Sequence, residues 1–308
     1  MDTIPKDNFI EFNTNTLEFI RKQYDLETPE RIEEAINLLE DWIKKQPHFM
    51  KKDFSRDYLE RTIIISKGSV ERAKFKLDRI CTFRTIYPEF FEVHDVRSYK
   101  IINDLQGVFL PKMTSDHYRI FFIKNKAKSF EKGFHDFYRY IFMQCEYIQA
   151  HDYCNGLVVI LDYRDANMME TLKFLNVNDL RKALEIIKDG YGMRINGMHF
   201  LTESNAMDAI VNVFKQVFSA KVAGRLLTHT SLDTLYQYVP KDLLPKEYGG
   251  KEKSLTEIQN NFVVELSSKE FTAYLNEMSK ACTNQHLRRD NDSYDSGLQG
   301  SFRTLSVD

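Results

Sequence analysis

Residues 243–250 read LLPKEYGG, a turn-rich stretch in a chain that has only 12 glycines and 7 prolines among 308 residues. Pro245 ends a helical pattern that begins near Leu232, because proline lacks the N–H that a helix interior requires. Gly249 and Gly250 can adopt backbone angles with positive φ that other residues avoid. The stretch therefore predicts the point where the chain leaves a folded domain, and nothing in it indicates catalysis.

The composition is that of a folded protein without a global charge signal. Hydrophobic residues make up 43% of the chain, and its length suits two domains of about 100–200 residues each. Lys and Arg number 43 against 45 Asp and Glu, so the net charge is −2. We expect no nucleic-acid partner, and any anion site has to come from a local cluster. We also expect a monomer.

Targeting and metal signals are absent from the sequence pattern. The first residues, MDTIPKDNFIEF, lack the basic and apolar regions of a secretory signal, and no apolar run reaches about 18 residues. The cysteines at 81, 145, 154 and 282 form no CxxC pair. These observations predict a cytoplasmic protein with reduced thiols and no metal site.

Two patterns of apolar spacing divide the chain. Helical spacing covers about 28–91, which predicts a small all-helical domain. Short β-branched or aromatic runs follow at 107–111, 118–123, 156–162 and 197–201, with helical spacing at 130–150 and 169–189. This alternation predicts an α/β domain with a mixed or parallel sheet. Residues 283–308 are polar and turn-rich, which predicts a disordered tail.

Common catalytic motifs are missing. The sequence has no G-x-S-x-G elbow, no phosphate loop, no dinucleotide fingerprint and no H-E-x-x-H motif. His199 and His229 have no nucleophile or carboxylate at a catalytic spacing, which favours structural histidines. We predict a protein that is not an enzyme and has no catalytic residues. A hydrolase of unfamiliar design stays open as an alternative.

Residues 203–225 form an unusually apolar segment. Ser204 or Asn205 can cap a helix with apolar side chains at i, i+3, i+4 and i+7, and the remaining side is also largely apolar. The segment is either an ordinary core helix or a helix that covers a cavity on one side and meets a membrane on the other. Lys221 and Arg225 are four residues apart, so we expect them on one helical face, either solvated or binding one anion.

Four stretches resemble the CRAL-TRIO lipid-transfer family: YRIFFI at 118–123, LVVILD at 157–162, INGMH at 195–199 and LYQYVPKDLLPKEYGG at 235–250. The resemblance covers about 10–280 and is greatest to the branch of α-tocopherol transfer protein and cellular retinaldehyde-binding protein, especially its insect members. It implies a helical domain at 1–92, a lipid-binding domain at 93–250 and a helical extension at 251–282. The sheet would form the floor of an apolar cavity, and residues 202–225 its helical gate.

The resemblance also implies two sets of site residues. The phosphoinositide head group would meet Arg194, Lys221, Arg225 and Lys67, although Ile64 and Gly68 replace the Arg and Phe of the family's N-terminal motif. We expect the cavity to be lined by two groups of residues, each of which could also be ordinary core. The sheet and its helices supply Tyr138, Ile141, Cys145, Val159, Leu161, Leu175, Leu184 and Ile187, and the gate supplies Met207, Ile210, Val211 and Phe214.

The function implied is transfer of a hydrophobic ligand without catalysis. The ligand would resemble tocopherol, a retinoid or carotenoid, or another isoprenoid, and no cofactor besides this ligand is expected. The protein would exchange it with phosphoinositide-containing membranes through transient, peripheral contact. The alternative is a lipid-sensing regulatory module that recruits a protein partner, which the polar tail at 283–308 would permit.

Overall fold

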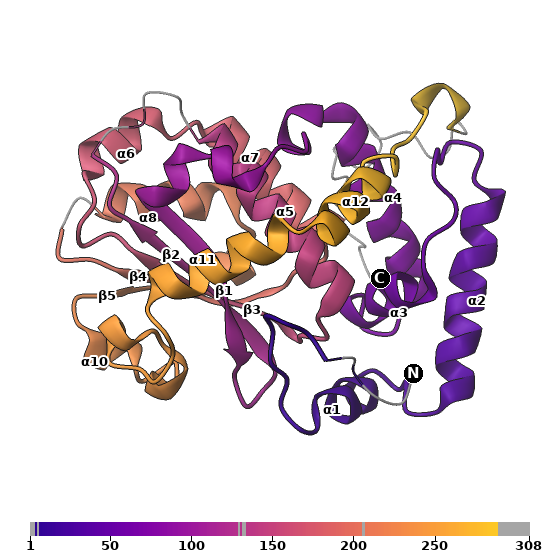
Figure 1. Ribbon diagram of the computed structural model, residues 1–308, viewed down its shortest axis with the longest axis horizontal. Coiled ribbons are helices and arrows are strands. Elements are labelled where there is room, and N and C mark those ends of the chain that lie inside the picture. Colours follow the sequence, from indigo (N-terminus) through magenta and orange to yellow (C-terminus); the bar gives the residue numbers. More distant parts are fainter. Residues whose placement is uncertain (1–3, 5, 129, 131–133, 205–206, 289–308) are drawn as a thin grey trace, which may run out of the picture.

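A helical N-terminal region and a larger α/β region make up the fold (Figure 1). The computed structural model describes residues 4, 6–128, 130, 134–204 and 207–288. Both fold classes expected from the sequence are confirmed, since all-helical and α/β patterns separate along the chain near residue 105.

The N-terminal region contains four α-helices. They are α1 Thr16–Gln23, α2 Pro29–Lys45, α3 Arg56–Ile65 and α4 Val70–Ile86, followed by 3-10 turns at Pro88–Phe90, Val96–Ser98 and Lys100–Asn103. Ser55 and Ser69 accept hydrogen bonds from the backbone of the first turns of α3 and α4, which fixes where these helices begin. The sequence did not predict α1, whose eight residues are short for a periodicity signal.

The sheet has five strands in the order β1-β2-β3-β4-β5. They are β1 Leu105–Met113, β2 Tyr118–Asn125, β3 Gly156–Asp162, β4 Ile195–Leu201 and β5 Leu226–His229. β1 is antiparallel to β2, and the other neighbours are parallel. The sheet is therefore mixed, as expected. β5 was missed because a four-residue edge strand carries almost no alternation.

Helices cover both faces of the sheet. They are α5 His135–His151, α6 Met168–Phe174, α7 Val177–Glu185, α8 Met207–Val217, α9 Ala220–Ala223, α10 Leu232–Leu235, α11 Leu255–Leu266 and α12 Lys269–Met278. A π-helical turn, Ile186–Gly190, continues α7. In Figure 1, α6, α7 and α8 lie together, while α11 crosses near β1 and α2 stands far from the sheet.

The segment 203–225 differs from the single helix expected. α8 ends at Val217, and α9 starts only at Ala220. The outer side of α8 exposes Asp208, Asn212 and Gln216, so the reading of a helix apolar on two sides is wrong for this conformation. Asn212 and Gln216 are polar but uncharged, so charged residues alone do not reveal this outer side. Asn205 and Ala206 lie outside the described residues.

LLPKEYGG closes the α/β region against the sheet face that α8 does not cover. The Tyr248 hydroxyl donates to Asp162 Oδ2 at the end of β3 (2.7 Å), and its ring lies 4.5 Å from that of Phe122. Gly249 has a φ of +73°, as its residue type suggested. Gly250 has a different role, because a Cβ there would lie 1.8 Å from the Leu244 carbonyl oxygen.

The first residues of the expected disordered tail are ordered. Thr283 donates its N–H to Thr85 Oγ1 (2.8 Å), and Arg288 pairs with Asp78 on α4 (2.9 Å). Asp78 and Thr85, two partly buried residues of α4, thus hold residues 283–288. This corrects the prediction of a disordered tail for these residues. Residues 289–308, the rest of the expected tail, lie outside the described residues. Of the helices in the described ranges, none is long and apolar enough to cross a membrane.

Candidate functional site

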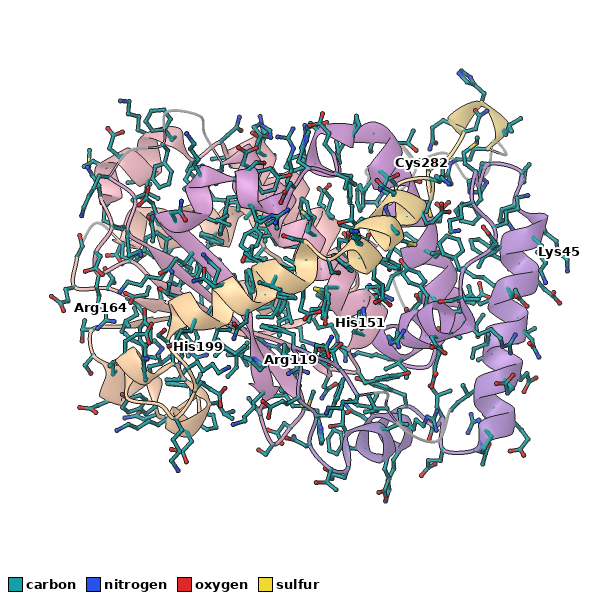
Figure 2. The ribbon with its side chains drawn as sticks, viewed as in Figure 1. Lys45, Arg119, His151, Arg164, His199 and Cys282 are labelled. Atoms are coloured by element: carbon teal, nitrogen blue, oxygen red, sulfur yellow. The ribbon has the colours of Figure 1, made fainter. Side chains whose placement is uncertain are left out.

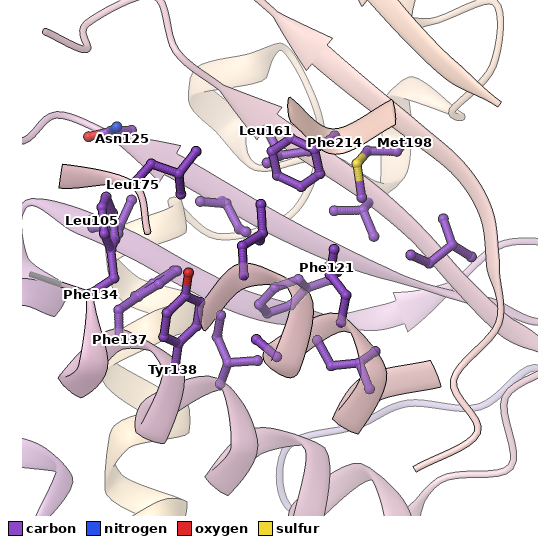
Figure 3. Close-up of a pocket in the computed structure, with 18 of the residues that line it drawn as sticks. Leu105, Phe121, Asn125, Phe134, Phe137, Tyr138, Leu161, Leu175, Met198 and Phe214 are labelled. Atoms are coloured by element: carbon purple, nitrogen blue, oxygen red, sulfur yellow. The ribbon is translucent and has the colours of Figure 1, made fainter. Parts of the chain in front are cut away.

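An apolar cavity lies between one face of the sheet and helices α5, α6, α7 and α8 (Figure 3). It contains about 930 Å³ of space, including space open to solvent. The register of the sheet explains its floor, since Phe121, Val159 and Met198 are neighbours across β2, β3 and β4 and therefore share one face. The cavity is thus built by strand alternation, with helices as its other walls.

Most of the sequence-predicted cavity residues line this space, and four do not. The structure brings together Tyr138, Ile141, Val159, Leu161, Leu175, Leu184, Ile187 and Phe214. Cys145 is buried one turn beyond Ile141, where α5 enters packed interior next to the ion pair of Glu146 with Arg84. Met207, Ile210 and Val211 are buried in the core, and only the later turn of α8, with Phe214, reaches the cavity.

A second pocket is basic. It is lined by Lys67, Lys188, Arg194, Lys221 and Arg225 together with Tyr24, Asn155 and neighbouring apolar side chains. None of the described residues that line it is an Asp or Glu. The four predicted head-group residues, which lie just after α3, just before β4 and in the segment 218–225, are therefore gathered in one place. Sequence reasoning missed Tyr24, Asn155 and Lys188, which lie far from the other residues in sequence or have no motif.

Hydrogen bonds hold the two arginines of this pocket. Arg194 Nη2 lies 2.9 Å from Asn155 Oδ1 and 2.5 Å from the Tyr24 hydroxyl, which in turn donates to Asn155 Oδ1 (2.7 Å). Arg225 Nη1 donates to the Ile195 carbonyl (2.9 Å). These partners are neutral, so both guanidinium charges remain available to an anion.

The cations of the basic pocket lie close enough together to repel one another. The charge of Arg194, followed by burial and the charges of Arg72 and Lys221, lowers the pKa of Lys67. Lys76 donates a hydrogen bond to the carbonyl of Lys188, which lines the pocket. Burial lowers the pKa of Lys76 to about 8; the charge of Asp189 opposes this effect and that of Arg194 adds to it. A bound anion would relieve this repulsion, which is the physical reason for regarding the pocket as an anion site.

Two local conformations differ from the sequence expectation. Lys221 lies in α9, whereas Arg225 follows Gly224 and directly precedes β5, so the two are not on one helical face. They meet in the pocket because the chain turns between them. Lys67 and Gly68 both have positive φ, and a Cβ at Gly68 would lie 2.6 Å from the Tyr24 carbonyl oxygen. This turn explains why no Phe can stand at position 68.

The apolar cavity and the basic pocket adjoin. Leu184, Ile187 and Ile195 line both, so one layer of side chains from α7, the π-helical turn and β4 separates them. The segment with α8 and α9 contacts both spaces as well, through Phe214 on one and Lys221 on the other. Within the described ranges, no group of three or more His, Cys, Asp or Glu could hold a metal ion.

Comparison with known proteins identifies the α/β region. The family model described as CRAL/TRIO domain matches residues 103–250. Residues 103–250 form a CRAL/TRIO domain. The family model described as Pinta-like, UBA domain matches residues 28–101, in front of the CRAL/TRIO domain.

Relatives match part of this chain. "Alpha-tocopherol transfer protein-like" from Mus musculus is 30% identical over 131 residues, 42% of this chain and 38% of that protein. The Homo sapiens protein of the same name is 30% identical over 42% of this chain and 37% of its own length. "Clavesin-2" from Mus musculus is 31% identical over 31% of this chain and 29% of its own length.

The matched segment thus spans a little over a third of the first of these relatives. Among solved structures, "Crystal structure of Sfh5" aligns with 87% of this chain and 98% of that chain, with a TM-score of 0.45 and 14% identity.

Proposed function

We propose that this protein binds a hydrophobic lipid in the apolar cavity and exchanges it with membranes that carry phosphoinositides. The observation that carries the proposal is the shared wall between a cavity without charged side chains and a pocket lined by five cations. A lipid tail and an anionic head group are the two chemistries that such neighbouring spaces fit. Relatives whose name includes tocopherol transfer agree with this class of function.

The free-energy scale explains why a membrane would be needed. Burying roughly 500 Å² of apolar ligand surface stabilises the bound state by about 12 kcal/mol before association costs, at about 25 cal/mol/Å². Such a ligand dissociates slowly into water. If the segment with α8 and α9 opens against a bilayer, both the ligand and the inner face of α8 pass between apolar phases.

The basic pocket would provide the coupling to the membrane. Each cation near an anionic surface contributes about 1 kcal/mol of binding, and a bidentate arginine contact to phosphate adds geometric selectivity. Lys221 and Arg225 flank the end of the opening segment, so a head group bound there would contact the part of the chain that has to move. No residue is assigned a catalytic role, and no cofactor besides the lipid is proposed.

Lipid extraction followed by mass spectrometry tests ligand binding. We expect a stoichiometric hydrophobe with the purified protein, or its uptake from added lipid. A protein that carries none and takes up none contradicts the proposal.

A vesicle-transfer assay tests the head-group site. We expect Lys221→Ala with Arg225→Ala to slow transfer to phosphoinositide vesicles about tenfold, and to leave transfer to neutral vesicles unchanged. The matched control removes two cations from the end of α2, Lys44→Ala with Lys45→Ala, where Figure 2 shows Lys45 at the far side of the molecule from His199 in the sheet. Equal effects of the two double variants would remove the basic pocket from the mechanism. Tail-dependent capture of a protein without lipid transfer would favour the regulatory alternative.

A further inference from the structure

Three hydrogen bonds hold Arg194, a cation of the basic pocket, at one corner of its guanidinium group. Arg194 Nη2 donates to the Tyr24 hydroxyl (2.5 Å), to the Asn155 carbonyl (2.5 Å) and to Asn155 Oδ1 (2.9 Å). The hydrogen bonds that the guanidinium group makes to described residues all leave from Nη2, so Nε and Nη1 remain as donors for an anion in the pocket. Arg194 is therefore fixed on one side and open on the other.

The Tyr24 hydroxyl is fully engaged in this arrangement. It donates its one proton to Asn155 Oδ1 (2.7 Å) and accepts from Arg194. Burial raises the pKa of Tyr24, although the charge of Arg194 opposes this, so the hydroxyl keeps its proton. The Tyr24 ring adds a second contact, because the guanidinium carbon of Arg194 lies 5.4 Å from its centroid. Tyr24 thus affects an anion in the pocket through Arg194 and not by donating to it.

The turn after α3 brings Tyr24 to the pocket. Tyr24 directly follows α1, and its backbone packs on the turn at Lys67 and Gly68. A Cβ at Gly68 would lie 2.6 Å from the Tyr24 carbonyl oxygen and 3.4 Å from the Tyr24 Cβ. Because Lys67 in this turn also lines the pocket, the same close packing places Tyr24 and Lys67 together beside Arg194.

Repulsion between cations explains why Arg194 needs to be held. The charge of Arg194 is the largest cause of the lowered pKa of Lys67, so the two charges lie close together. A long side chain that was free to turn away would have to be ordered again, against this repulsion, each time an anion bound. Neutral partners such as Tyr24 and Asn155 keep Arg194 in place without cancelling its charge.

We propose that Tyr24 is a positioning residue of the basic pocket, which holds Arg194 beside Lys67 in the orientation that receives a phosphate group. This inference rests on the proposed function and deepens it, because it assigns a residue that prepares the head-group site before the anion arrives. Tyr24 precedes both regions that match known families, 28–101 and 103–250. The short helix α1 and the residue after it are thus part of the binding machinery of this chain.

A double-mutant cycle tests the proposal, with inositol trisphosphate titrated into the full-length protein in a calorimeter. Tyr24→Phe keeps the ring and removes the hydroxyl. We expect the affinity to fall about three- to tenfold, the ratio that one hydrogen bond gives. In the Arg194→Ala background, Tyr24→Phe should have no further effect, because nothing remains to be positioned. A hydroxyl that met the phosphate itself, or a general loosening of the fold, would still lower the affinity there.

Tyr236→Phe is the matched control. The Tyr236 hydroxyl donates to the Tyr248 carbonyl (2.8 Å), and Lys241 Nζ lies 5.2 Å from its ring, but Tyr236 does not line the basic pocket. We expect this variant to bind inositol trisphosphate as the unmodified protein does. Equal or tighter binding by Tyr24→Phe, or a loss that persists beside Arg194→Ala, would overturn the positioning role. If the unmodified protein binds no inositol trisphosphate, the head-group site of the proposed function fails and the inference fails with it.

Two further measurements complete the test. If Tyr24→Phe does not fold, the unmodified protein with carbon-13-labelled tyrosine is titrated by NMR. The ring resonances of Tyr24 should shift as inositol trisphosphate saturates the protein while those of Tyr236 stay, and a stationary Tyr24 would overturn the proposal. Sedimentation with phosphatidylcholine vesicles that contain phosphatidylinositol bisphosphate should rank the variants in the same order. An effect on the soluble trisphosphate alone would support the positioning role and contradict the membrane part of the proposed function.

Discussion

Gly250 illustrates how a single residue can be fixed by close packing rather than by its backbone angle. The Leu244 carbonyl oxygen would lie 1.8 Å from a Cβ at position 250, and the Gly250 N–H lies 3.3 Å from the Pro245 carbonyl oxygen. A side chain there has to displace backbone, which does not give way as the end of a flexible side chain would. The sequence indicated that a glycine was needed but could not separate this reason from positive φ.

We therefore expect Gly250→Ala to lower the free energy of unfolding by at least about 2 kcal/mol, since the inserted methyl group displaces packed backbone. Urea unfolding followed by circular dichroism measures it. Gly224→Ala is the control, because the nearest atom to a Cβ at Gly224, the Ala220 carbonyl oxygen, is 3.6 Å away and the conformation is helical. That variant should be neutral or more stable by about 0.4–1 kcal/mol. Equal losses in both variants would contradict the packing argument.

The sequence predicts that a residue lines the cavity where the periodicity of its strand or helix decides which way its side chain points. Val159 and Leu161 alternate on one strand face, so both lie on the cavity floor. Cys145 shares a helical face with Ile141, yet it lies outside the cavity because the cavity ends between successive turns of α5. Periodicity gives direction but not the extent of a space, which depends on what packs at each turn.

At the scale of elements, β4 and β5 are joined by a pair of buried histidines. His199 Nδ1 lies 2.9 Å from His229 Nε2, and His229 Nδ1 lies 3.2 Å from Thr234 Oγ1 on α10. The ring of Tyr238 lies 5.4 Å from that of His199. These contacts attach the short edge strand β5, which directly follows the segment with α8 and α9. The sequence favoured structural histidines, a prediction that nothing here tests, and it could not show that the two are neighbours.

This pair predicts acid sensitivity. Burial, followed by the charge that His229 would carry, lowers the pKa of His199 to about 4. In the unfolded chain, His199 therefore binds a proton near its usual pKa of about 6.5, whereas in the folded protein it does so only at a lower pH. The free energy of unfolding thus falls as the pH drops from about 6.5 toward 4. The full effect of His199 is about 3 kcal/mol, of which about 1–2 kcal/mol is lost between pH 6.5 and 5.

His199→Asn tests this effect, because the Asn amide can replace Nδ1 as a hydrogen-bonding group but does not titrate. The difference in free energy of unfolding between pH 6.5 and 5 should be smaller in the variant by about 1–2 kcal/mol. His94→Gln, which changes a half-exposed histidine, should leave that difference unchanged. A variant curve parallel to that of the unmodified protein would show that His199 is not the group responsible.

For the whole molecule, the sequence predicted an apolar cavity and a group of cations but not that the two spaces adjoin. The basic pocket combines Tyr24 from the end of α1, Lys67 after α3, Lys188 in the π-helical turn and the arginines beside β4 and β5. Residues so distant along the chain meet only through tertiary packing. The resemblance to a known family supplied four residues of the pocket, Lys67, Arg194, Lys221 and Arg225, whereas Tyr24 and Lys188 carry no signal in periodicity or spacing. The basic pocket is thus a property of the assembled fold.

The joined sites predict a salt dependence that separates surface attraction from apolar exchange. Between about 0.1 and 1 M salt the Debye length falls from about 10 to 3 Å, so attraction between the basic pocket and a phosphoinositide surface weakens, whereas burial of the ligand in the cavity does not. We expect transfer to phosphoinositide vesicles to slow about tenfold over this range, toward the rate measured with neutral vesicles. The Lys221→Ala, Arg225→Ala variant should start near that lower rate and change little. Stopped-flow transfer of a fluorescent hydrophobe measures all four conditions, and an equal salt response of both proteins would mean that charges outside the basic pocket bring the protein to the membrane.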